Sequence, residues 1–172
     1  MPFRTSDQML CPDPITSSGI IDEAKRRPPA DMSEYHAIVA GLALAAGAPA
    51  DVEVCYDRAR SILLYAWLDY DLFIPAQTQA LSAVELALHH RVHGNGGPTS
   101  STMGKLIIKA REDTVLPALG KSVEERRGDL YERLLDMRNG LAHGTADRVP
   151  PSQTVDVFQI CCAVIADLYP QC

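Results

Sequence analysis

Apolar residues recur every three or four positions along most of this chain, the spacing that one buried face of an α-helix requires. The clearest example lies at about residues 75–92, where the predicted buried stripe consists of Leu81, Val84, Leu88 and Val92. No stretch alternates apolar and polar residues for long enough to predict a sheet. The pattern therefore predicts an all-α fold, an antiparallel helical bundle of about five to six helices joined by short connections.

Capping residues and breakers set the expected bounds of these helices. The predicted helices span about 34–46, 52–70, 75–92, 102–115, 128–144 and 152–169. Ser33, Asp51 and Ser152 are the candidate N-caps of the first, second and last helices, because their side-chain oxygens can accept from the free N–H groups of a first turn. Pro75 suits the first turn of the third helix.

The chain divides at about residue 33. Residues 1–33 carry five prolines among Ser, Thr and Asp, which predicts an extended Pro-rich arm with at most one helical turn near 20–25. Residues 34–172 form the predicted helical bundle domain. Within it, we expect the fourth helix to turn Met103, Ile107 (or Leu106), Ala110 and Thr114 toward the core. Its basic side chains, Lys105, Lys109 and Arg111, are expected to face solvent.

Composition narrows the function without assigning one. The chain has 172 residues, of which 47% are hydrophobic and 22% charged, as in an ordinary globular protein. The net charge of −6 excludes a global basic field, so any contact with RNA must come from a local basic cluster. The five cysteines have no CxxC spacing, which predicts that they are core residues of a protein in a reducing compartment. The apolar run 37–46 is too short to span a bilayer, which favours a cytoplasmic protein without a membrane segment.

The most unusual stretch is 136–144, Asp-Met-Arg-Asn-Gly-Leu-Ala-His-Gly, at the end of the fifth predicted helix. The apolar stripe of that helix consists of Leu130, Leu134, Met137 and Leu141. Arg138, Asn139 and His143 interrupt the pattern close to that stripe. A guanidinium, an amide and an imidazole grouped at a helix end suit a phosphodiester, and they suit equally the capping of the helix, where a cation is favoured.

Glu85 is the second unusual residue, because it falls among the apolar positions of the third helix. A carboxylate in such a stripe needs a cation or several donors, and we expect Arg138 to be its partner. The alternative is a purely architectural bond to the helix backbone or to another core residue. Glu85, His89 and His93 share one helix face, but no fourth ligand accompanies them, so neither a metal nor a cofactor is predicted.

With these residues in view, the chain resembles the HEPN superfamily of helical domains. The resemblance covers about residues 52–169 and rests on an Arg followed by four residues and a His, Arg138 to His143, with Asn139 after the Arg and Gly144 after the His. The stretches Ala-Val-Glu-Leu-Ala-Leu at 83–88 and Thr-Met-Gly-Lys-Leu-Ile at 102–107 extend it. Carried over, Arg138 and His143 would be the catalytic pair, Asn139 the orienting amide, and Glu85 the acidic residue on the earlier helix.

The resemblance implies a metal-independent endoribonuclease, a hydrolase that acts in toxin–antitoxin or phage defence systems. It also implies a homodimer, an RNA substrate and a nucleotidyltransferase-type antitoxin as partner. RNA brings its own nucleophile, the 2′-hydroxyl, so a base, an acid and a cation suffice, and an imidazole with a pKa of about 6.5 can move the proton. Other members keep the fold as a non-catalytic dimerisation or binding module, and the absence of a Tyr at 145–147 leaves that alternative open.

Overall fold

The computed structural model describes residues 10–20, 26–94, 101–120, 122, 124, 128–142 and 149–170. All regular structure in these ranges is helical, which confirms the predicted all-α bundle. The elements are α1 (Pro14–Gly19), α2 (Met32–Ala40), α3 (Ala50–Tyr65), a 3-10 turn (Tyr70–Leu72), α4 (Phe73–His93), α5 (Met103–Glu112), α7 (Leu130–Ala142) and α8 (Pro151–Leu168). None of the helices in these ranges is long and apolar enough to cross a membrane.

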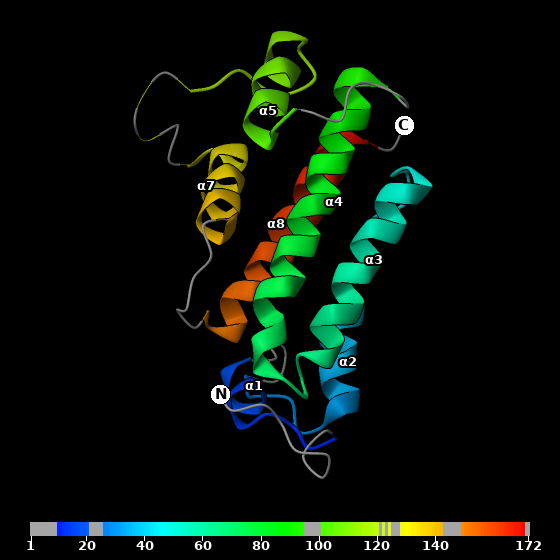
Figure 1. Ribbon diagram of the computed structural model, residues 1–172, viewed down its shortest axis with the longest axis vertical. Coiled ribbons are helices and arrows are strands. Elements are labelled where there is room, and N and C mark those ends of the chain that lie inside the picture. Colours follow the sequence, from blue (N-terminus) through cyan, green and yellow to red (C-terminus); the bar gives the residue numbers. More distant parts are fainter. Residues whose placement is uncertain are drawn as a thin grey trace.

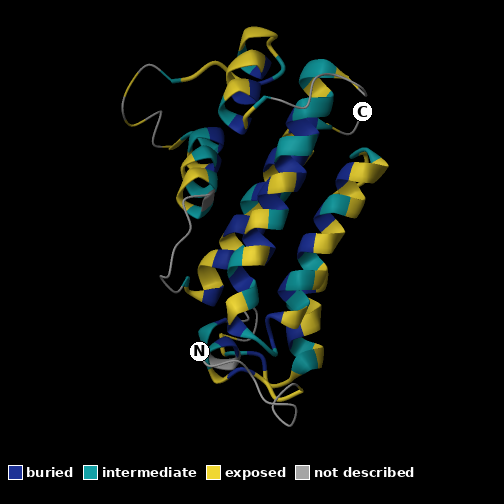
Figure 2. Ribbon diagram, in the orientation of Figure 1, coloured by how far each residue is buried: buried dark blue, intermediate teal, exposed yellow. Residues whose placement is uncertain are grey.

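The long helix α4 lies at the centre of the bundle, with α3 and α8 beside it and α5 and α7 along another side (Figure 1). The buried face of α4 is wider than the predicted stripe, because four alanines join that stripe in the core: Ala76, Ala80, Ala83 and Ala87. Side chains of a single carbon let neighbouring backbones approach closely. Figure 2 shows the buried residues concentrated along α4 and on the sides of α3 and α8 that face it.

Helix direction follows from two contacts between α4 and α8. The Gln77 side-chain amide donates to the Thr154 hydroxyl oxygen at 2.6 Å near the beginning of both helices. Near the other end, the Tyr169 hydroxyl donates to the Ala87 carbonyl at 3.1 Å. These helices therefore run in the same direction, whereas α3 and α4 run antiparallel (Figure 1). Helices α5 and α7, which lie between α4 and α8 in the sequence, bring the chain back to the end where α4 begins.

Three helix starts differ from the predicted caps. Helix α3 begins at Ala50 after Pro49, so Asp51 lies inside its first turn and not at the N-cap. The first helix is capped by Asp31, whose Oδ1 accepts from the amides of Ser33 and Glu34 at 2.9 Å, so Ser33 lies inside the helix. This helix ends before Gly41. The last helix begins with Pro151, because a proline at the first position lacks only an N–H that would have no partner there. Capping at Ser33, at Asp51 and at Ser152 was therefore wrong.

The N-terminal arm contains a short helix packed on the bundle. Asp13 caps α1 by accepting from the Ile15 amide at 2.9 Å. The Thr16 hydroxyl donates to the Ala66 carbonyl at 2.8 Å, and both Asp13 and Thr16 are fully buried. The helical turn expected near 20–25 stays a prediction, because residues 21–25 lie outside the described ranges, and the helix at 14–19 was not predicted.

Thr114, which the sequence pattern placed in the core, lies beyond the end of α5 and is exposed. Arg111, which the pattern placed in solvent, is not a solvent-facing residue. Its side chain is only 11% exposed and lies between α5 and the start of α7. Its guanidinium donates to Asp129 and to Glu132, each at 2.8 Å. The prediction was wrong because periodicity places a residue on a helix face, but it does not reveal that a second helix covers part of that face.

Candidate functional site

Helix α7, which carries Arg138 and Asn139, is held in place by a cap at its start and by apolar contacts with the core. Asp129 precedes α7, and its Oδ1 accepts from the amides of Tyr131 at 2.9 Å and Glu132 at 3.1 Å. Tyr131 and Leu134 are buried, and the rest of the predicted stripe, including Leu141, packs against the core. This packing directs the neighbouring row of α7, which contains Arg138, toward α4.

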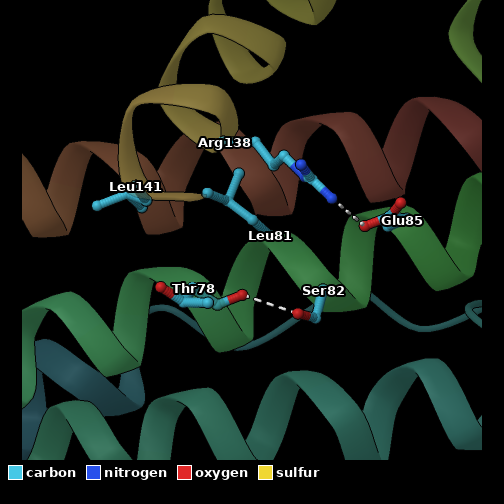
Figure 3. Close-up of a pocket in the computed structure, with 6 residues that line it drawn as sticks. All are labelled: Thr78, Leu81, Ser82, Glu85, Arg138 and Leu141. Carbon is cyan, nitrogen blue, oxygen red and sulfur yellow. Dashed lines mark hydrogen bonds and ion pairs between the residues drawn. The ribbon is translucent and has the colours of Figure 1, made fainter. Parts of the chain in front are cut away.

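Arg138 and Glu85 lie next to each other, as predicted from the sequence. Arg138 Nη2 is 4.0 Å from Glu85 Oε2, at the outer limit of an ion pair. Figure 3 shows the guanidinium reaching from α7 toward the carboxylate on α4. The side chains are 36% and 29% exposed, so Glu85 lies at the edge of the buried stripe and not inside it. Water therefore reaches both charges, and the pair costs less to desolvate than a fully buried one.

A pocket of about 140 Å³ opens at this ion pair. Its lining residues come from α4 and α7: Thr78, Leu81, Ser82, Glu85, Arg138 and Leu141. The two hydroxyls already donate to the helix backbone, Thr78 to Ile74 at 3.0 Å and Ser82 to Thr78 at 2.9 Å. Arg138 is thus the group in this pocket that can donate to an anion. Two leucines give the pocket an apolar side, which lowers the local dielectric around that charge.

A second hollow of about 240 Å³ adjoins the first along α4. It is lined by Ser82, Glu85, Leu86, His89, Ser101 and Leu106, so Ser82 and Glu85 belong to both hollows. Sequence periodicity did not reveal this hollow, because Leu106 reaches it from α5 and Ser101 from the loop before α5. The only signal was the placement of Glu85 and His89 one turn apart.

The remaining predicted site residues are placed differently. Asn139 is exposed and does not line the pocket at Arg138. His143 and Gly144 lie outside the described residues, so the proposed catalytic pair of Arg138 and His143 stays a prediction. The structure therefore brings Arg138 and Glu85 together and leaves Asn139 on the outer side of α7.

Histidines at the end of α4 do not form a metal site. The His89 and His93 rings lie one turn apart with centroids separated by 5.1 Å. His90, which the sequence did not single out, places Nε2 3.1 Å from Asp51 Oδ2 at the start of α3. Within the described ranges, no group of three or more His, Cys, Asp or Glu side chains is arranged to hold a metal ion.

The adjacent residues Cys161 and Cys162 of α8 belong to the core. Cys161 is fully buried, and Cys162 lies 2.9 Å from the Tyr56 hydroxyl. Burial raises the pKa of both thiols, and for Cys162 the Tyr56 bond and Arg60 oppose that shift only in part. Since the thiolate is the nucleophilic form, neither residue is suited to covalent catalysis.

Comparison with known proteins identifies no relative: no protein-family model, curated protein or solved structure matches this chain. The resemblance to the HEPN superfamily therefore rests on the residues from 83 to 144 quoted above.

Proposed function

We propose that this protein is a metal-independent endoribonuclease of the HEPN type that cuts RNA by attack of the 2′-hydroxyl. One observation carries the proposal: the Arg138 guanidinium lies at a pocket beside a carboxylate and is exposed enough to meet a ligand. An arginine fork matches two phosphate oxygens, and a partly apolar pocket strengthens that attraction. The proposal also relies on the sequence, in which His143 follows Arg138 by five residues.

In the proposed reaction, the 2′-oxygen attacks the adjacent phosphorus and the bond from phosphorus to the 5′-oxygen breaks. A base accepts the 2′-hydroxyl proton and an acid protonates the leaving 5′-oxygen, so the products are a 2′,3′-cyclic phosphate and a 5′-hydroxyl. His143 supplies these proton transfers, and in a homodimer the two copies of His143 divide them. Arg138 neutralises charge on the phosphorane oxygens, and Glu85 positions the guanidinium.

The test is cleavage of single-stranded RNA in the presence of EDTA, with the fragment ends analysed chemically. We expect 2′,3′-cyclic phosphate ends with the wild type and a strong loss of cleavage with His143→Ala. Arg133→Gln serves as a matched control, because Arg133 is an exposed residue of the same helix. A requirement for a divalent ion, or full activity of His143→Ala, would contradict the proposal.

As a toxin of a toxin–antitoxin or phage defence system, the protein should also arrest cell growth when it is expressed alone. His143→Ala should relieve that arrest, and so should coexpression of a nucleotidyltransferase-type antitoxin. Harmless expression of the wild type at a level that cleaves RNA in vitro would contradict the toxin role while leaving the nuclease reaction intact.

A second candidate function is a non-catalytic helical module that dimerises or binds a protein. The observation that favours it is an apolar row on α3, where Val54 is 51% and Tyr65 58% exposed, with Ile62 partly buried between them. These positions share one helix face, and the hollow beside them includes Val54, Ile62 and Gln79. The molar mass by light scattering tests this candidate. The module would be favoured over the nuclease by two results: a dimer that both Val54→Asp and Tyr65→Asp dissociate, and RNA that stays uncut when it is incubated with the wild type.

A further inference from the structure

Ser82 and Glu85 line both hollows along α4, and these two adjoining hollows together make up the groove. At one end, Arg138 and Leu141 of α7 line the groove, and Figure 3 shows Arg138 pointing toward Glu85. At the other end, His89 of α4 and Leu106 of α5 close it. A ligand that places an anion at Arg138 therefore has a larger hollow within reach on the far side of Glu85.

The larger hollow has the chemistry of a site for a flat, partly polar ring. Leu86 and Leu106 contribute apolar side chains, and His89 contributes an aromatic ring. Unpaired RNA bases are bound by apolar and aromatic contacts to their faces, histidine included, and by hydrogen bonds to their edges. Ser82 and Ser101 place hydroxyl oxygens at the border of this hollow.

Glu85 decides which base edge fits. Arg138 is the one ion-pair partner of Glu85 in the described part of the chain, and at 4.0 Å it lies beyond hydrogen-bond distance. No hydrogen bond to the Glu85 carboxylate is found among the described residues. A carboxylate only accepts, so it binds best to two N–H donors that lie side by side.

Among the four RNA bases, guanine alone presents two such donors, N1–H and the 2-amino group, side by side on its Watson–Crick edge. Adenine and cytosine place a ring-nitrogen lone pair beside their amino group, and uracil flanks its single N–H with carbonyl oxygens. Each of these arrangements sets a lone pair against the carboxylate.

We propose that the hollow between Glu85 and His89 is a guanine subsite, which receives a base near the phosphate that Arg138 binds. The proposal rests on the proposed ribonuclease function for its ligand class. It adds a preference for guanine and assigns that preference to Glu85, with His89 and Leu106 holding the ring. Both Glu85 oxygens then accept from the guanine edge, while the Arg138 guanidinium lies beside the carboxylate, 4.0 Å from Oε2.

Binding without cleavage tests the subsite. The probes are fluorescent oligoadenylates with 2′-O-methyl groups, which block the nucleophile, and with adenine, hypoxanthine or guanine at one central position. Fluorescence anisotropy should give a dissociation constant about tenfold lower for guanine than for adenine, in the range of a bidentate base contact. Hypoxanthine, which lacks the 2-amino group, should lie between them. Equal affinities for the three probes would overturn the proposal.

Variants separate base reading from general binding. Glu85→Gln should bring the guanine and adenine affinities to within about twofold of each other, because an amide replaces one acceptor by a donor. His89→Ala should weaken the guanine probe and reduce the same ratio in part. Glu53→Gln, an exposed residue of α3, is the matched control and should leave the ratio unchanged. A guanine preference that survives Glu85→Gln would exclude Glu85 as the reader.

The two proposals fail in distinguishable ways. A guanine preference in binding without cleavage of unmodified RNA would leave the subsite standing and overturn the nuclease. Cleavage of unmodified RNA with no dependence on guanine, and equal binding of the three probes, would overturn the subsite and leave the nuclease standing.

Discussion

Arg111 on α5 donates to Asp129, the residue that precedes α7, with 2.8 Å between Nη2 and Oδ1. The same carboxylate oxygen accepts from the first free amides of α7, those of Tyr131 and Glu132. A side chain from one helix thus completes the cap of the next. Because α7 carries Arg138, this bond sets the position of the candidate site as well as the packing of two helices.

Arg111→Met should lower the free energy of unfolding by about 3 kcal/mol, because it leaves the largely buried carboxylate of Asp129 and the partly exposed one of Glu132 without their cation. Urea unfolding followed by circular dichroism measures this change. Lys109→Met is the matched control, because Lys109 of the same helix pairs with Asp113 at the surface and should contribute almost nothing. Equal effects of the two substitutions would contradict the structural role of Arg111.

Glu85→Gln should lower the free energy of unfolding by no more than about 1 kcal/mol, because both members of its pair are exposed to water. A fully buried pair would give about 3–5 kcal/mol, the value that a position inside the stripe had suggested. Thermal unfolding of Glu85→Gln and of the double variant Glu85→Gln/Arg138→Met distinguishes the two cases. A loss above about 2 kcal/mol that the double variant restores would indicate a tighter pair than the 4.0 Å separation implies.

Arg138→Lys should lower the rate of RNA cleavage by about a hundredfold, the loss typical of removing one donor to a developing oxyanion. Lysine keeps the charge but lacks the planar fork that binds two phosphate oxygens. The single-turnover rate in EDTA is the measurement. Arg133→Lys, an exposed arginine one turn earlier on α7, should cleave at the wild-type rate. A wild-type rate for Arg138→Lys would show that the fork is not used.

Gly140→Ala should raise the free energy of unfolding by about 0.5–1 kcal/mol, the difference in helix propensity between the two residues. Gly140 lies inside α7, and an added Cβ would meet nothing within 4 Å. Differential scanning calorimetry measures the shift. Gly19→Ala provides the opposite case, because its Cβ would lie 2.7 Å from the Pro151 ring and should lower the melting temperature. Destabilisation by Gly140→Ala would mean that α7 requires the glycine.

Alkaline pH should weaken the fold in part through Tyr131. Burial, followed by the nearby Asp167, raises the pKa of Tyr131 to about 12 from its ordinary value of 10.0. Between pH 10 and 12 the unfolded chain has lost this proton and the folded chain keeps it, so stability falls as pH rises. Tyr131→Phe should therefore lose less stability than the wild type over this range in urea titrations. Parallel pH profiles of the two proteins would contradict the shift.

The helices were predictable because a period of 3.6 residues is a local property of the chain. Their inner faces were predictable only to within one neighbouring row. On α3 the apolar spacing favours a row through Cys55 and Ile62, with Leu63 on a flanking row. The structure instead buries Tyr56 and Leu63 and leaves Cys55 and Ile62 only partly buried. Adjacent apolar rows differ by about 100°, and only the position of the partner helices decides between them.

The candidate site was predictable where a polar residue interrupted an apolar stripe. That signal identified Glu85, and the need for a cation identified Arg138, which lies beside it. Thr78 and Ser101 gave no such signal, because small polar residues are common on any exposed helix face or loop. The role of His143 stays a prediction from the sequence, since it lies outside the described residues.

The alanine-rich helix α4 and helix α7 differ in how well their backbone amides are protected from solvent. α4 packs against α3, α5, α7 and α8, whereas α7 packs against α4, α5 and α8 and keeps an outer face in water. Amide protons in the middle of α4 should therefore exchange only when the whole bundle unfolds, and those of α7 through a smaller opening. One wall of the groove can then detach and return while the wall that bears Glu85 and His89 stays in place.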